Sequence, residues 1–152
     1  MNMEARIARL RALLSENLVD ALLVTKEENV HYFSGFRGDS TALLVTPERL
    51  LLVTDSRYTE QAAAEASDYE IVEQRDGLYK KIAEVAMDCG IIALAFEGGV
   101  LSYDSYTKMQ GLLGEISFDT SLNLDPLRQV KDADEIALIR RACKIADEGF
   151  AH

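Results

Sequence analysis

Apolar residues recur along the chain with two alternating spacings, one typical of helices and one typical of strands. Ile7, Leu10 and Leu14 follow the helical spacing in the first seventeen residues. Asp20-Ala21-Leu22-Leu23-Val24-Thr25 is instead a short, nearly continuous apolar run, which is typical of a buried strand. Because the two kinds of segment alternate, the sequence predicts an α/β domain.

The same spacings predict the remaining elements. Helices are expected over residues 3–17, 29–33, 55–66, 78–89 and 102–113, and strands over 20–25, 41–46, 49–54, 69–73, 91–96 and 116–124. Pro47 suits the second position of a type I turn, so the runs on either side of it are expected to form a β-hairpin. Asp55 and Ser56 are candidate N-caps, and Asp125-Pro126 should break the pattern. We expect a mixed β-sheet of about five to six strands with helices on both faces.

The last segment differs from the rest. Asp132 and Glu135 have the spacing of a capping box, and a long helix follows them. Its apolar residues form two adjacent stripes: Ile136, Ile139, Cys143, Ala146 and Phe150 in one, and Leu138, Ala142, Ile145 and Gly149 in the other. Because this wide face still continues at His152, we expect a longer protein, with residues 1–130 as one domain and 131–152 as a junction helix.

Composition narrows the class of protein. The chain has 152 residues, the size of about one domain, and a net charge of −10. Such a field repels phosphate backbones, so nucleic acid is not an expected partner. No apolar run approaches the roughly 20 residues that span a bilayer, and no signal peptide is recognisable, so we expect a cytoplasmic protein without membrane contact. Cys89 and Cys143 lie in apolar helical patterns and are expected to be buried free thiols.

Three segments carry a resemblance to a known family. Asn29-Val30-His31-Tyr32-Phe33-Ser34-Gly35-Phe36 resembles its Asn-aliphatic-x-Tyr-x-x-Gly-Phe segment, and Thr54-Asp55-Ser56-Arg57-Tyr58-Thr59-Glu60-Gln61-Ala62 resembles its Thr-Asp-x-Arg-Tyr-x-x-Gln-Ala segment. Residues 127–136 resemble the junction that leads into its catalytic domain. With all three in the same order, the chain resembles the N-terminal domain of the creatinase/prolidase family.

The resemblance implies a two-domain parent. Its second, pita-bread domain would hold two divalent metal ions (Mn, Co or Zn) through two Asp, one His and two Glu, and would cleave the peptide bond before proline. Such parents are proline dipeptidases and aminopeptidases P, whereas creatinase uses no metal. The metal ligands would follow the junction helix. Because this chain has only His31 and His152, we expect it to bind no catalytic metal and to hydrolyse nothing by itself.

The loop Phe36–Asp39 is the candidate substrate-binding segment. The resemblance implies that this loop reaches toward the active site of a neighbouring subunit. There Arg37 would pair with a substrate carboxylate, and Phe36 would cover a proline ring. The alternative is a solvated turn in which Gly38 supplies backbone freedom. His31 is expected to have a structural role on the helix surface, with a supporting contact at a subunit interface as the alternative.

Asp55, Arg57 and Tyr58 form the second candidate group. We expect a structural role, with Asp55 capping the following helix, Arg57 tying the start of that helix to a nearby carboxylate or carbonyl, and Tyr58 packing. A direct contact with a ligand is the alternative.

The resulting hypothesis is a non-catalytic N-terminal domain of a Xaa-Pro metallopeptidase. Its partners would be its own catalytic domain, a second copy in a homodimer and a proline-containing peptide, and it would control access to the active site. Two other hypotheses remain open. One is a peptide- or protein-binding module from a catalytically inactive relative. The other is the N-terminal domain of a creatinase-type amidinohydrolase that acts on a small guanidino compound.

Overall fold

The computed structural model describes residues 3–151, so His152, the predicted end of the junction helix, lies outside the described residues. Within that range six strands form one mixed sheet in the order β4-β3-β2-β1-β5-β6. The strands are β1 (Ala21–Val24), β2 (Ala42–Val45), β3 (Leu50–Asp55), β4 (Glu70–Gln74), β5 (Leu94–Glu97) and β6 (Ser121–Leu122). The helices are α1 (Met3–Glu16), α2 (Glu27–Ser34), α3 (Thr59–Glu65), α4 (Leu78–Asp88), α5 (Tyr103–Leu113), α6 (Asp125–Gln129) and α7 (Ala133–Phe150).

Strand pairing confirms the predicted fold class. β2 is antiparallel to both β1 and β3, whereas β1 with β5, β3 with β4 and β5 with β6 are parallel pairs. The turn between β2 and β3 is held by Thr46, whose backbone N–H donates to the carbonyl of Arg49 at 2.9 Å. The hydroxyl of Thr46 accepts a hydrogen bond from the Arg49 N–H at 2.8 Å. The predicted hairpin is therefore confirmed.

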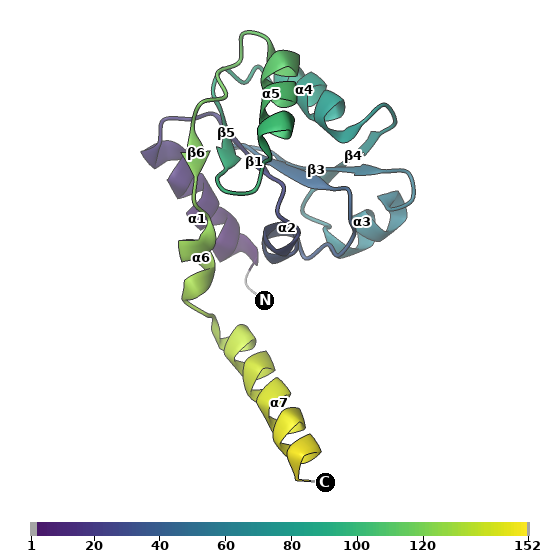
Figure 1. Ribbon diagram of the computed structural model, residues 1–152, viewed down its shortest axis with the longest axis vertical. Helices are drawn as coiled ribbons and strands as arrows, with labels where there is room; N and C mark the ends of the chain where they lie inside the picture. Colours follow the sequence, from purple (N-terminus) through teal and green to yellow (C-terminus); the bar gives the residue numbers. More distant parts are fainter. Residues whose placement is uncertain (1–2, 152) are drawn as a thin grey trace.

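The sheet separates two hydrophobic cores. Figure 1 shows α1, α2 and α3 on one face and α4 and α5 on the other. Leu22 and Val24 of β1 pack into the first core, and Ala21 and Leu23 pack into the second. Because side chains alternate between the faces of a strand, a strand covered on both sides must be apolar at every position. This explains the continuous apolar run that the sequence shows there.

Helix α7 lies outside both cores. It projects away from the body of the domain (Figure 1), and none of its residues, all of them described, is buried. Its first turn has the predicted capping box, in which Asp132 accepts from the Glu135 N–H and Glu135 accepts from the Asp132 N–H, each at 2.9 Å. Leu138, Ile145 and Phe150 are exposed, and Phe150 is 94% exposed.

The two predicted N-caps, Asp55 and Ser56, are wrong. Helix α3 begins at Thr59 and has no side-chain cap, because Asp55 is the last residue of β3 and its carboxylate accepts from the Arg57 N–H at 3.0 Å. Asp125-Pro126 ends the preceding strand pattern as predicted, and Pro126 lies in the first turn of α6. Proline is tolerated there because the first N–H groups of a helix have no partner within the helix.

The predicted burial of the cysteines is also wrong. Both thiols are free, but Cys89 is only half-buried and Cys143 is exposed. Cys89 follows the last residue of α4, where its sulfur accepts a hydrogen bond from the Arg49 guanidinium at 3.0 Å. Cys143 lies on α7, whose apolar pattern the rest of the described chain does not cover.

Candidate functional site

The loop after α2 begins at a glycine that the helix end requires. Gly35 has φ +81°, and its N–H bonds the carbonyl of His31 at 2.8 Å, which is a common way for a helix to end. The chain then turns inward, so that Phe36 is 1% exposed. The Phe36 ring packs edge-on against Tyr58 with 5.9 Å between the centroids. The loop is therefore anchored in the core at its first residue.

Gly38 packs directly on that anchor. A Cβ atom at Gly38 would overlap the ring of Phe36 and would come within 3.1 Å of the Tyr58 ring. The backbone can pass this close to the two aromatic rings only because residue 38 has no side chain. The positions that come next, Asp39 and Ser40, are both exposed.

Arg57 connects the second group of candidate residues to this loop. Its guanidinium makes two hydrogen bonds to Asp55, of 2.9 Å from Nε and 2.6 Å from a terminal nitrogen. The same terminal nitrogen lies 3.4 Å from a carboxylate oxygen of Asp39. These hydrogen bonds from Arg57 lower the pKa of the Asp55 carboxyl and raise the pKa of the guanidinium. Arg57 thus contacts nearby carboxylates, and these contacts join the end of β3 to the loop instead of holding the start of α3.

His31 lies beside the loop on the surface of α2. Its Nδ1 is 3.1 Å from the carbonyl of Gly35, a geometry in which Nδ1 carries the proton and Nε2 is left free. A depression of about 440 Å³ brings His31 together with the loop. It is lined by Glu27, Glu28, His31, Phe36, Arg37, Gly38, Asp39 and Tyr58.

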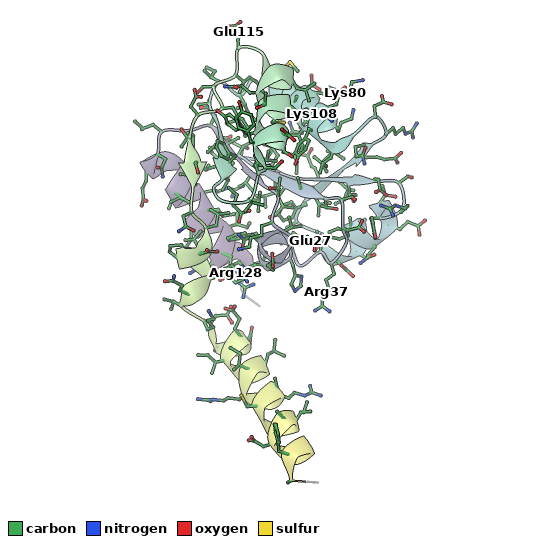
Figure 2. The ribbon with its side chains drawn as sticks, in the orientation of Figure 1. Glu27, Arg37, Lys80, Lys108, Glu115 and Arg128 are labelled. Carbon is green, nitrogen blue, oxygen red and sulfur yellow. The ribbon has the colours of Figure 1, made fainter. Side chains whose placement is uncertain are left out.

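Arg37 is the cationic side chain of this depression. Its backbone N–H donates to the Glu65 carboxylate at 3.0 Å, which fixes the backbone. Its side chain is exposed, and its guanidinium has no hydrogen-bond or ion-pair partner in the described part of the chain. Figure 2 shows Arg37 and Glu27 on the side of the body from which α7 projects. An unpaired guanidinium in this position is suited to bind a carboxylate through two parallel hydrogen bonds.

A buried polar network on the opposite side of α2 was not predicted. Asn29 is fully buried and donates to the carboxylate of Glu97, and its side-chain carbonyl accepts from Arg128 at 3.0 Å. Glu97 also accepts from the backbone N–H of Lys26 at 3.2 Å. Burial raises the pKa of the Glu97 carboxyl. The network joins α2 to the end of β5 and to α6.

Tyr32 makes the second unpredicted connection. Its hydroxyl donates to the carbonyl of Leu127 in α6 at 3.1 Å and accepts from Arg9 of α1 at 3.0 Å. Asn29 and Tyr32 are three positions apart, so both lie on the same side of α2. Both belong to the segment that carries the resemblance. This helical spacing is the sequence signal from which a shared contact of Asn29 and Tyr32 with the segment before the junction helix could have been predicted.

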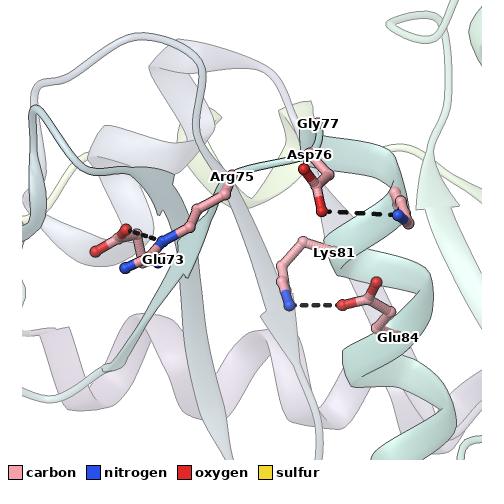
Figure 3. Close-up of a pocket in the computed structure, with 7 residues that line it drawn as sticks. Glu73, Arg75, Asp76, Gly77, Lys81 and Glu84 are labelled. Carbon is pink, nitrogen blue, oxygen red and sulfur yellow. Dashed lines mark hydrogen bonds and ion pairs between the residues drawn. The ribbon is translucent and has the colours of Figure 1, made fainter.

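A second polar depression, of about 310 Å³, lies where β4 leads into α4 (Figure 3). Its three cations each have a carboxylate partner. The pairs are Arg75 with Glu73 at 2.7 Å, Lys80 with Asp76 at 3.7 Å and Lys81 with Glu84 at 2.5 Å. Since every charge is matched within the depression, this region offers a ligand less than the Arg37 side does.

Metal ligands do not converge anywhere in the described part of the chain. Among residues 3–151 no three His, Cys, Asp or Glu side chains come close enough together to hold an ion. These residues therefore do not fit a two-metal centre, and no step that involves a metal is assigned to them. None of the described helices combines the length and the apolar character that crossing a membrane requires.

Comparison with known proteins gives consistent matches. The family model described as the creatinase/prolidase N-terminal domain matches residues 6–130. The chain is 30% identical to the uncharacterized peptidase YqhT of Bacillus subtilis over 148 residues, which are 97% of this chain and 42% of that protein. The chain thus spans about two fifths of the length of such curated relatives.

Solved structures of peptidases also superpose on this chain. An Xaa-Pro dipeptidase from Bacillus anthracis superposes with a TM-score of 0.93 at 32% identity, over 99% of this chain and 42% of that one. The N-terminal domain of the cytoplasmic peptidase PepQ from Mycobacterium tuberculosis superposes with a TM-score of 0.73 at 32% identity. That match covers 81% of this chain and 98% of the other.

Proposed function

This chain belongs to the creatinase/prolidase N-terminal domain family, and from that membership we propose that it is the non-catalytic N-terminal domain of a Xaa-Pro metallopeptidase, a proline dipeptidase or an aminopeptidase P. The observation that carries the proposal is the superposition on the Bacillus anthracis Xaa-Pro dipeptidase, which extends over α7 as well as the sheet. The parent would be a cytoplasmic hydrolase that cleaves the peptide bond before proline. This domain would supply binding and access control rather than chemistry.

The depression beside α2 supports a role in binding substrate. A peptide presents a terminal carboxylate, and the unpaired guanidinium of Arg37 is suited to receive it. Asp39 and His31 line the same depression and would contact the peptide beside it. Phe36 is buried, so its contribution would be to hold the loop in place while Arg37 reaches the active site of the neighbouring subunit.

The exposed face of α7 supports a second domain as partner. Leu138, Ile145 and Phe150 have no cover in the described structure, and an apolar stripe of this kind is stabilised when another surface buries it. We assign that surface to the protein's own catalytic domain, which would hold two divalent metal ions (Mn, Co or Zn). A homodimer would then bring the Arg37 loop of one subunit to the catalytic domain of the other.

The test uses the complete gene product that contains this chain. It is assayed with added manganese on a Xaa-Pro dipeptide, on a longer peptide with proline in the second position, and on creatine. Cleavage of either peptide supports the proposal and distinguishes dipeptidase from aminopeptidase. Turnover of creatine alone would identify the creatinase-type alternative, and the absence of all three activities would leave the binding module.

The role of Arg37 is tested by Arg37→Ala in the same protein. Loss of a hydrogen-bonded charge pair should lower kcat/KM on the peptide about 10- to 100-fold, mainly through KM. Arg75→Ala is the matched control, because Arg75 is equally exposed but pairs with Glu73 away from the loop. Peptidase activity that is unchanged by Arg37→Ala would remove Arg37 from the substrate site while leaving the family assignment intact.

A further inference from the structure

Arg6 connects three helices from an almost fully buried position. It lies in the first turns of α1 and is 2% exposed. Its guanidinium carbon is 3.8 Å from the centroid of the Tyr32 ring, and one terminal nitrogen donates to the Tyr32 carbonyl at 3.0 Å. The other terminal nitrogen is 2.8 Å from Asp132 and 3.3 Å from Glu135. Arg6 therefore joins α1 and α2 to the start of α7.

The two carboxylates that Arg6 binds are the two members of the capping box of α7. Asp132 uses one oxygen to accept from the Glu135 N–H and the other to accept from Arg6. The Glu135 oxygen near Arg6 also accepts from the Asp132 N–H. The hydrogen bonds from the Glu135 N–H and from Arg6 lower the pKa of Asp132. One guanidinium thus holds the group that defines where α7 begins and which way it points.

Little else in the described structure fixes this direction. Helix α6 is attached to α2 through Tyr32 and Arg128, but residues 130–132 separate α6 from α7. Beyond its first turn, α7 has no buried residue and no hydrogen bond or ion pair with the rest of residues 3–151. The angle between α7 and the sheet is therefore determined at the first turn of α7, where Arg6 binds, and at the short connection before it.

We propose that Arg6 is a positioning residue that sets the direction of α7, and with it the placement of whatever α7 carries. The 18 residues of α7 span about 27 Å at the usual helical rise. Cys143 lies about 15 Å along this length, so a swing of ~20° at the first turn moves it by ~5 Å. A small change at Arg6 is thus enlarged along the helix.

The chemistry of the contact favours orientation over stability as its purpose. Nε of Arg6 is buried and has no partner in the described part of the chain. Burying a charge costs free energy, and replacing a buried ionic group by an apolar one of similar volume is often neutral for folding. What an apolar residue cannot reproduce is a planar group that donates to a carbonyl and two carboxylates at fixed angles.

A distance measurement on the chain of residues 1–152 tests the proposal without any enzymatic assay. Spin labels are placed at native Cys143 and at Glu60→Cys on α3, in a Cys89→Ser background. Glu60 is exposed, so the label does not disturb the core. The distribution of label distances is compared among the parent, Arg6→Met and Arg6→Lys.

Arg11→Met is the matched control, since Arg11 lies on α1 but binds the carbonyl of Thr46 instead of α7. A sample labelled only at Cys143 measures intermolecular distances, which are subtracted.

The expected result is one narrow distribution in the parent and in Arg11→Met. Arg6→Met should broaden or shift it by ~5 Å or more, with Arg6→Lys between the two. Circular dichroism checks that each variant is folded. Asp132→Asn combined with Glu135→Gln, which keeps Arg6 but removes both partner charges, should broaden the distribution as well. An unchanged distribution in folded Arg6→Met or in this double variant would overturn the proposal. Because no activity is measured, this result does not depend on the proposed peptidase function.

Discussion

At the scale of single residues, Glu97 shows how a costly group can organise its surroundings. Burying a carboxyl disfavours its charged form, and burial is the largest cause of the raised pKa of Glu97. The carboxylate nevertheless accepts hydrogen bonds from Lys26 at the start of α2 and from Asn29 one turn later. Asn29 in turn accepts from Arg128. Glu97 therefore helps to position α2, which carries His31 and leads into the Arg37 loop.

The raised pKa of Glu97 predicts a specific pH dependence. The folded protein holds the proton more tightly than the unfolded chain, so the free energy of unfolding falls as pH rises from about 4.5 through the raised pKa. Glu97→Gln removes this titration. Urea denaturation at several pH values measures the free energy of unfolding of the parent and of Glu97→Gln. The value for the parent minus the value for Glu97→Gln should decrease as pH rises.

Glu70→Gln provides a control of opposite sign. A hydrogen bond from Arg49 lowers the pKa of Glu70, so its contribution is present above the unfolded pKa and is lost as pH falls. The free energy of unfolding of the parent minus that of Glu70→Gln should therefore increase with pH. Solvent screening keeps this difference small because the pair of Arg49 and Glu70 is exposed. Equal slopes for the two variants would contradict the assignment of the raised pKa to Glu97.

At the scale of elements, the first residues of two helices show what the local sequence can predict and what it cannot. Ser102 and Ser56 both precede helical spacing and both are plausible N-caps by residue type. Only Ser102 acts as one, with its hydroxyl accepting from the Ser105 N–H at 3.1 Å. Ser56 lies in a turn that Asp55 and Arg57 hold together, and α3 starts three residues later. The side-chain contact between Asp55 and Arg57 overrides the local preference.

This difference predicts unequal effects of the same substitution. Ser102→Ala removes a cap and should lower the free energy of unfolding by about 1 kcal/mol. Ser56→Ala removes a hydroxyl that has no hydrogen-bond partner of its own in the described structure, and should change it by less than about 0.5 kcal/mol. Chemical denaturation of the two variants measures both values. A larger loss for Ser56→Ala than for Ser102→Ala would place the start of α3 where the local sequence alone puts it.

At the scale of the whole molecule, most of the architecture follows from local pattern, while the junction does not. The alternation of strand and helix spacings, together with the hairpin at Pro47 between β2 and β3, is sufficient to predict the mixed sheet. The loop at Arg37 was predicted from the resemblance of residues 29–36 to a family segment, whereas Gly38 by itself indicated only a turn. Arg6 could not be found in this way. Its partner Asp132 is 126 positions away, and an arginine near the start of an amphipathic helix ordinarily belongs to its solvated face.

Deleting residues 132–152 tests how independent the body is from α7. Because α7 buries no residue in the described structure, its removal costs no hydrophobic burial, and the ion pairs of Arg6 with the partly exposed Asp132 and Glu135 are lost. The free energy of unfolding should fall by less than about 2 kcal/mol, which corresponds to a few degrees in thermal midpoint. The deletion should also reduce binding of a hydrophobic dye, because the two exposed apolar stripes of α7 are gone. A chain with Leu138→Glu and Ile145→Glu is the matched control, since it keeps α7 and the Arg6 contact but interrupts one of the two stripes. It should bind less dye than the parent and keep the thermal midpoint of the parent. A midpoint more than about 10 °C lower in the deletion alone would mean that α7 packs on the body, and the stripe would then have its partner within this chain.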